Sequence, residues 1–398
     1  MSKQIEPAID SLRQLSIDGL RSRKFRATLT IETQLGDPAG SSEYAQFYGA
    51  PYYHSYLLSY RSDGLRVYSR LDLPPVDMPA NGYPVIIFAH GWVSASDAPS
   101  YAFAYQQNAY YGDILDSYVK AGFAVLTPGF RGHGTVNGCP ADGLAYMQAY
   151  DNGSYLIPLF NAIDILNLLE GVGSLNQVNW RAWGANNVKI DSSRIYITGH
   201  SKGGDAALAA LAVASSGTLN NQFKAASIWC GSIEGRIEQG AFYGAQEASR
   251  EALTDPAYFP FMPPTWQTDD YWGTIEAGLA QKKRQLYDTV KRYVRDQADA
   301  DSDTNSLVEV MASLDAAKHL QYVDVPLDLH YSDRDHFSVP AWNASIIRLL
   351  RAVGGSGNAY LYRGNSHDLR VVPGWSPAGA VSGRATAVSR TIARFQSN

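Results

Sequence analysis

The chain has 398 residues, of which 45% are apolar, 12% aromatic and 18% charged, and its net charge is −5 with an isoelectric point near 5.9. This composition is typical of a soluble globular protein with ample material for a core. It carries no basic patch that would favour nucleic acid as a partner, and no apolar run long enough to predict a membrane-spanning helix.

The termini and the cysteines bear on location and redox chemistry. The N-terminus has no apolar signal core, so the sequence as given predicts a cytoplasmic protein, and the location stays open if a leader was removed. Only two cysteines are present, Cys139 and Cys230, which excludes a disulfide framework. Two free thiols are expected and one bridge is the open alternative. A homo-oligomer is compatible with all of this.

Strand and helix patterns alternate along most of the chain. Residues 1–50 are polar and mixed, with a helical stretch near 9–23, and are predicted to be an N-terminal extension. Strand patterns at 55–61 and 65–71, joined by Ser62-Asp63-Gly64, predict a hairpin. Further strands are expected at 84–89, 124–127, 194–198, 225–229, 326–331 and 359–362, and helices at 109–121, 155–170, 202–214, 341–353 and 384–395. This order predicts an α/β protein with a mostly parallel sheet, helices on both faces and the antiparallel hairpin at one edge.

Residues 231–321 interrupt this alternation, because they contain helical patterns and no strand pattern. So long a connection inside a compact domain is usually functional. We therefore predict an inserted helical cap, which divides the core into residues 51–230 and 322–398. Its Pro- and aromatic-rich part offers candidates for an apolar substrate pocket, with packing inside the cap as the equal alternative: Tyr258, Phe261, Trp266 and Trp272.

A motif with chemical content lies where the strand at 194–198 meets the helix at 202–214. Gly199-His200-Ser201-Lys202-Gly203 fits the G-x-S-x-G pattern of a nucleophile elbow, in which a serine occupies a sharp turn between a strand and a helix. The motif alone is weak, since an ordinary strand–helix turn can contain glycine and serine. The strand before it and the helix after it supply the context that the motif requires, so Ser201 is the candidate nucleophile.

A nucleophilic serine needs a base and an orienting acid. His367 follows the last predicted strand, where a loop can bring it to the serine, whereas His336 lies too close in sequence to the candidate acids. Asp333 and Asp335 both follow the preceding strand, and the spacing to the next helix favours Asp335.

The same chemistry needs two backbone N–H groups that face the developing oxyanion. Lys202 directly follows the serine, and Trp92 belongs to the loop after the buried strand at 84–89, so their amides are the candidates. No metal and no cofactor are required.

Six segments in this order resemble the α/β-hydrolase superfamily, and within it the hydrolases related to the prolyl oligopeptidase catalytic domain and to dienelactone hydrolases: SYRSDGLRVYSRLDLP, PVIIFAHGW, GFRGHG, RIYITGHSKGG, LHYSDRDHFSVP and YLYRGNSHDL. The resemblance covers about residues 55–230 and 322–396. It implies an α/β-hydrolase fold and a Ser-His-Asp hydrolase. One additional residue after Asp335 departs from the family spacing and keeps Asp333 open as the acid, and the first fifty residues are too few for the propeller of an oligopeptidase.

The predicted reaction is acyl transfer through a serine ester on a small molecule or short peptide, the bond being an ester, lactone, thioester or small amide. An acyltransferase or cyclase with the same triad is one alternative. A non-catalytic binding protein on the same fold is the other, because fold alone does not imply function.

Overall fold

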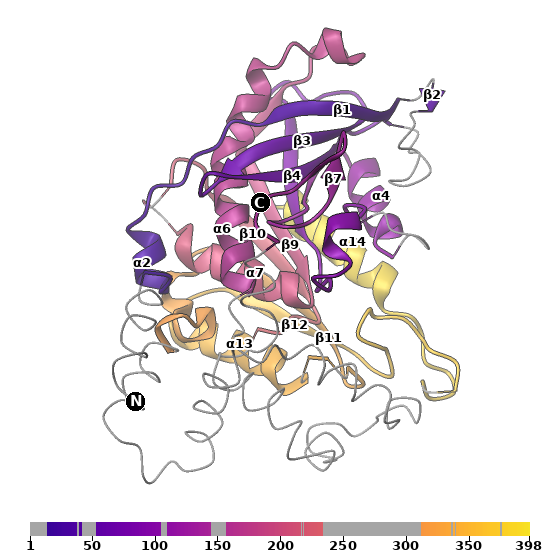
Figure 1. Cartoon of the computed structure of the whole chain (residues 1–398). Helices are drawn as coiled ribbons and strands as arrows, with labels where there is room; N and C mark the ends of the chain where they lie inside the picture. The colour runs from indigo at the N-terminus through magenta and orange to yellow at the C-terminus, as the bar shows by residue number, and fades with distance from the viewer. Residues whose placement is uncertain are drawn as a thin grey trace.

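The structure is a computed structural model, and it describes residues 14–37, 40–41, 53–104, 110–144, 157–215, 217, 219–233, 312–335, 337–338, 340–374 and 376–398. Most strands join one sheet: β1 (Thr30–Asp37), β2 (Gly40–Ser41), β3 (Ser55–Ser62), β4 (Leu65–Asp72), β5 (Tyr83–Ala89), β6 (Ala124–Pro128), β9 (Ile190–His200), β10 (Phe223–Trp229), β11 (Leu327–Ser332) and β12 (Gly357–Tyr362). The strand order across this ten-stranded sheet is β12-β11-β10-β9-β5-β6-β4-β3-β1-β2 (Figure 1). A separate small ribbon pairs β7 (Thr135–Val136) with β8 (Cys139–Pro140).

The strands from β12 to β6 run parallel, and those from β4 to β2 continue the sheet in antiparallel pairing. The predicted hairpin is confirmed, since β3 and β4 pair in antiparallel register from Ser55 opposite Asp72 to Ser62 opposite Leu65. The predicted mostly parallel core is confirmed as well.

Helices cover both faces of the sheet (Figure 1), and they are α2 (Ile17–Arg21), α4 (Gly112–Lys120), α6 (Ile157–Gly171), α7 (Lys202–Val213), α13 (Pro340–Ala352) and α14 (Arg384–Gln396). Side chains of α6, α7 and α13 belong to one apolar cluster, and those of α4 and α14 belong to another. The position of strand β5 between two layers of helices explains why its sequence is wholly apolar. Val85 and Ile87 belong to the first cluster, whereas Ile86 and Phe88 belong to the second, so both faces of the strand are buried.

Strand β1 lies within the predicted N-terminal extension, where no strand was expected. It pairs antiparallel with β3, and register shifts fall between Ile31 and Thr33 and between Gln34 and Gly36. The register shifts affect the pairing and leave the sequence pattern intact, because the buried Leu29, Ile31 and Leu35 still lie at two- and four-residue spacing. Ile31 belongs to the first apolar cluster, together with side chains of α6 and α7, whereas Leu35 belongs to a third, smaller cluster.

Residues 234–311, which form most of the predicted cap, lie outside the described residues. The division into extension, core and cap therefore stays a prediction. Among the helices that the structure does describe, none has the length and apolar character needed to cross a bilayer.

Candidate active site

The carboxyl ends of the parallel strands bring the predicted site residues to one edge of the sheet. Ser201 directly follows β9, Asp335 lies three residues after β11, and His367 lies five residues after β12. Pairing aligns these ends, because Gly199 lies opposite Ala89 of β5 and His200 lies opposite Trp229 of β10. Open α/β sheets bind ligands at this edge.

Ser201 has a backbone conformation that residues other than glycine rarely adopt. Its φ is 56° and its ψ is −126°, and the helix α7 begins at the next residue. The turn is held by backbone hydrogen bonds: the Ser201 amide donates to the Trp229 carbonyl at 3.0 Å, and the Ser201 carbonyl accepts from Gly204 at 2.9 Å. A sharp, strained strand-to-helix turn is the geometry of a nucleophile elbow.

The glycines around the serine allow the close approach of α7 to β5. A Cβ atom on Gly203 would lie 2.2 Å from the Ala89 carbonyl oxygen and 2.3 Å from that of His90, and a Cβ on Gly199 would lie 2.4 Å from the Gly203 carbonyl oxygen. The first turn of α7 is thus packed backbone-to-backbone against the end of β5. This contact brings the loop of His90 next to the serine.

His367 and Asp335 are paired. The His367 Nδ1 atom lies 2.8 Å from Asp335 Oδ1 and 2.9 Å from Asp335 Oδ2, and both side chains are buried. The Asp335 Oδ1 atom also accepts from the backbone amides of Phe337 and Ser338, both at 2.9 Å. These bonds fix the carboxylate, and a carboxylate on Nδ1 leaves Nε2 as the ring nitrogen on the side away from Asp335.

Asp333, the alternative acid, makes different contacts. Its Oδ1 atom accepts from the Gly364 amide at 2.7 Å, and its carboxylate lies 3.9 Å from the exposed Arg363 guanidinium. These contacts join the loop after β11 to the loop after β12. The structure therefore brings Asp335 to His367, whereas the carboxylate of Asp333 contacts Gly364 and Arg363.

The loop that carries His367 is anchored from α14. Arg384 donates to both carboxylate oxygens of Asp113 at 2.8 Å, and its Nη1 donates to the Asp368 carbonyl at 3.2 Å. The Arg384 amide donates to the Leu369 carbonyl at 3.0 Å. The sequence did not predict this anchor, because Arg384 lies beyond the motif and its carboxylate partner Asp113 is 271 positions away.

The candidate oxyanion amides belong to the residue after Ser201 and to a loop that approaches Ser201. Lys202 is the first residue of α7, and Trp92 is a half-exposed residue of the loop after β5. A Cβ on Gly91, the residue before Trp92, would lie 3.3 Å from the Cβ of Ser201. The four predicted pocket residues of the cap, Tyr258, Phe261, Trp266 and Trp272, lie outside the described residues, as does His336.

Cys230 is a neighbour of the acid that the sequence did not single out. It directly follows β10, is fully buried and has a φ of 42°. The ligand atoms of Cys230, Asp335 and His367 lie within 4.8 Å of one another, which is a donor set that a metal ion could use among the described residues. Asp335 and His367 are hydrogen-bonded to each other, as expected for the acid and base of a catalytic serine. Burial and the adjacent Asp335 carboxylate raise the pKa of the Cys230 thiol well above its ordinary value. Both cysteines are free, as expected.

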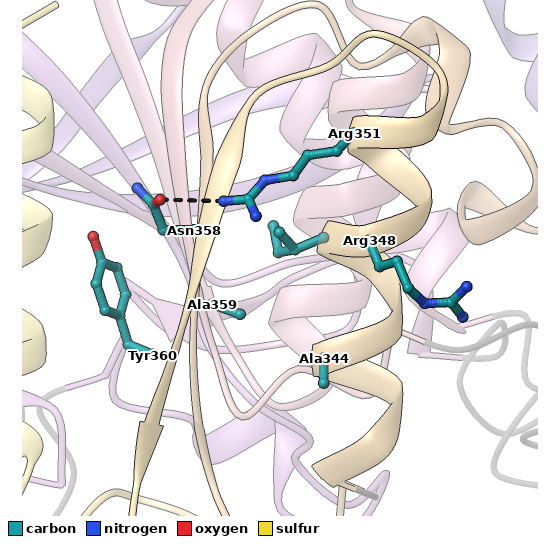
Figure 2. A pocket seen from close by; sticks show the side chains of 7 residues that line it. Ala344, Arg348, Arg351, Asn358, Ala359 and Tyr360 are labelled. Atoms are coloured by element: carbon teal, nitrogen blue, oxygen red, sulfur yellow. Dashed lines mark hydrogen bonds between the residues drawn. The ribbon is translucent and has the colours of Figure 1, made fainter.

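A hollow of about 430 Å³ lies elsewhere, between α13 and the edge strand β12 (Figure 2). Its lining side chains come from the helix and from the middle of the strand, and Arg351 donates to the Asn358 side chain across it at 3.4 Å. Neither Ser201 nor His367 lines this hollow. The candidate active site is therefore assigned from side-chain chemistry at the strand ends.

No protein family model matches this sequence, and a search of curated proteins found no match either. Solved structures do match. One is an acetyl xylan esterase from Paenibacillus sp. R4, with 14% identity, a TM-score of 0.51, and coverage of 98% of this chain and 94% of that one. Another, described as a dipeptidyl aminopeptidase IV from Bacteroides ovatus, has 14% identity and a TM-score of 0.50 over 86% of this chain. This chain has the α/β-hydrolase fold. It spans only 36% of the length of the Bacteroides protein.

Proposed function

We propose that this protein is a serine hydrolase that forms a covalent acyl-enzyme on Ser201. The observation that carries the proposal is the buried hydrogen bond from His367 to the Asp335 carboxylate, at the same sheet edge as the strained turn of Ser201. The bonds that fit this site are those of an ester, a lactone, a thioester or a small amide.

The geometry supports the following roles. Asp335 holds the Nδ1–H of His367, so Nε2 carries the lone pair that takes the proton of the Ser201 hydroxyl. The Ser201 oxygen then attacks the carbonyl carbon, and the amides of Trp92 and Lys202 stabilise the oxyanion of the tetrahedral intermediate. His367 returns the proton to the leaving group, which leaves the acyl group on Ser201. Water, activated by the same histidine, releases the acid.

The first experiment is a panel of ester, lactone, thioester and peptide substrates, run on the parent protein and on Ser201→Ala. The panel includes acetyl esters and dipeptide amides, because an acetyl xylan esterase and a dipeptidyl aminopeptidase share the fold. We expect the parent to turn over at least one class and the variant to lose nearly all of it. A fluorophosphonate should label Ser201 and no other serine. Undiminished turnover by Ser201→Ala would refute the mechanism.

The same panel, repeated with a competing alcohol or amine, identifies the acyl acceptor. A hydrolase gives the free acid as the main product at low acceptor concentration. Products that carry the alcohol or amine even at low concentration would move the assignment to an acyltransferase.

The acid is tested with a matched pair of variants. Asp335→Asn should lower kcat by a factor on the order of 10⁴, because the amide cannot hold His367 in its productive tautomer. Asp333→Asn is the control, since it keeps the Oδ1 atom that accepts from Gly364 and has no contact with the base among its hydrogen bonds. The opposite ranking of the two variants would assign the role to Asp333.

A further inference from the structure

Two buried side chains outside the triad connect the three loops that carry the catalytic groups. The Gly91 amide donates to the Tyr111 hydroxyl at 3.1 Å, and the same hydroxyl lies 2.6 Å from Nδ1 of His200. The Nε2 atom of His200 lies 3.1 Å from the backbone carbonyl oxygen of His367. Gly91 precedes Trp92, His200 precedes Ser201, and the last contact is to His367 itself.

Each of these three hydrogen bonds has a defined direction. A carbonyl oxygen only accepts, so Nε2 of His200 carries the hydrogen that it donates to His367. A neutral imidazole has one N–H, so Nδ1 of His200 accepts and the Tyr111 hydroxyl donates to it. The Tyr111 oxygen then accepts from the Gly91 amide. All three bonds donate in one direction, an arrangement in which neighbouring bonds strengthen one another.

The surroundings keep both side chains in the required protonation state. Burial, together with the nearby His367 ring, holds the pKa of His200 well below its ordinary value, and burial raises the pKa of the Tyr111 phenol. The Tyr111 ring packs edge-on against His200, with ring centroids 5.4 Å apart. The loop approaches so closely that a Cβ on Gly91 would lie 2.9 Å from the Tyr111 hydroxyl oxygen.

We propose that Tyr111 and His200 are positioning residues that align the Trp92 amide with Ser201 and His367. The inference rests on the proposed hydrolase function. Without the Tyr111 hydroxyl, the Gly91 amide and Nδ1 of His200 lose their partner inside the protein, and the loop that presents Trp92 is released. An oxyanion donor acts on the transition state rather than on the bound substrate. The loss therefore falls on kcat and leaves KM nearly unchanged.

The experiment compares Tyr111→Phe with Tyr110→Phe. Tyr110 is the matched control, because its ring packs against Tyr111 at 4.6 Å between centroids, and its loss of a hydroxyl leaves the Gly91 bond intact. Complete loss of an oxyanion donor costs about 100- to 1000-fold in kcat, so displacement of one should cost Tyr111→Phe about 10- to 100-fold. KM should stay within about twofold of the parent value. Affinity for a boronic acid, which mimics the tetrahedral intermediate, should fall in parallel with kcat.

A second pair of variants keeps the test independent of the folding of Tyr111→Phe. His200→Gln retains one donor and one acceptor, whereas His200→Leu retains neither. We expect the glutamine variant to keep more of the parent kcat than the leucine variant at equal melting temperatures. Equal kcat values for these two, or a kcat of Tyr111→Phe within twofold of Tyr110→Phe, would overturn the inference.

The two levels of the proposal fail separately. If Ser201→Ala keeps the parent activity, the hydrolase function itself is wrong. If activity depends on Ser201 but is insensitive to Tyr111 and His200, the function stands and only the positioning role is wrong.

Discussion

The backbone of Ser201 predicts that the protein gains stability when its candidate nucleophile is replaced by glycine. Its φ of 56° and ψ of −126° lie in a region that residues with a Cβ rarely occupy. Such a conformation costs on the order of 1–3 kcal/mol and persists where the surrounding structure enforces it. Ser201 is also the N-cap of α7, but its side chain makes no capping hydrogen bond. Loss of the hydroxyl therefore removes no helix cap.

The comparison of Ser201→Gly with Ser201→Ala isolates this strain. Alanine keeps the Cβ and with it the strain, so Ser201→Ala should unfold with nearly the parent free energy. Glycine removes the strain but costs about 0.5–1 kcal/mol in additional backbone entropy. The net result should be a free energy of unfolding about 1 kcal/mol higher for Ser201→Gly than for Ser201→Ala. Both variants should lack esterase or peptidase turnover.

The measurement is urea-induced unfolding of the parent and both variants at one pH, with the slopes compared so that midpoints report stability. A glycine variant that is less stable than the alanine variant by the entropy term alone would show that the turn stores no strain. In that case the backbone of Ser201 would be relaxed, and the turn would have no stability cost.

Three further predictions concern residues around the site and the core. An alkylating reagent should modify Cys139 in the native protein and reach Cys230 only after unfolding, because Cys139 is exposed whereas Cys230 is buried with a raised pKa; mass spectrometry of the labelled peptides decides this. Burial lowers the pKa of His330 to about 3, so between pH 6 and 4 the unfolded chain binds a proton that the native protein excludes. As the pH decreases through this range, this group should lower the free energy of unfolding by about 1.4 kcal/mol per pH unit. The buried His90 and His133 also have lowered pKa values and titrate over the same range, so His330→Gln should reduce the total slope by one proton's contribution. An unchanged slope would refute the assignment. Gly203→Ala should lower both melting temperature and kcat, since its Cβ would overlap two carbonyl oxygens, whereas Gly173→Ala, with open space around it, should match the parent in both assays.

Much of the core was predictable because local patterns determine it. Three features are examples, because each is determined by residues that are close together in the sequence: the wholly apolar run of β5, the Ser62-Asp63-Gly64 turn and the glycines around Ser201. The order of these segments was enough to predict a parallel sheet whose strand ends carry the candidate nucleophile, acid and base. Strand β1 was missed although Leu29, Ile31 and Leu35 keep the spacing of a strand, because the surrounding fifty residues were interpreted as a polar extension.

The sequence by itself determined the type of fold, the strand–helix joint at Ser201 and the loops from which an acid and a base would come. Only the tertiary structure decided which carboxylate meets His367, because Asp333 and Asp335 are two residues apart and their hydrogen-bond partners lie about thirty residues further along the chain. The same holds for Tyr111 and His200, which are 89 positions apart and have no motif in common. A side chain's direction depends on packing between distant segments, and spacing along one segment carries no information about it.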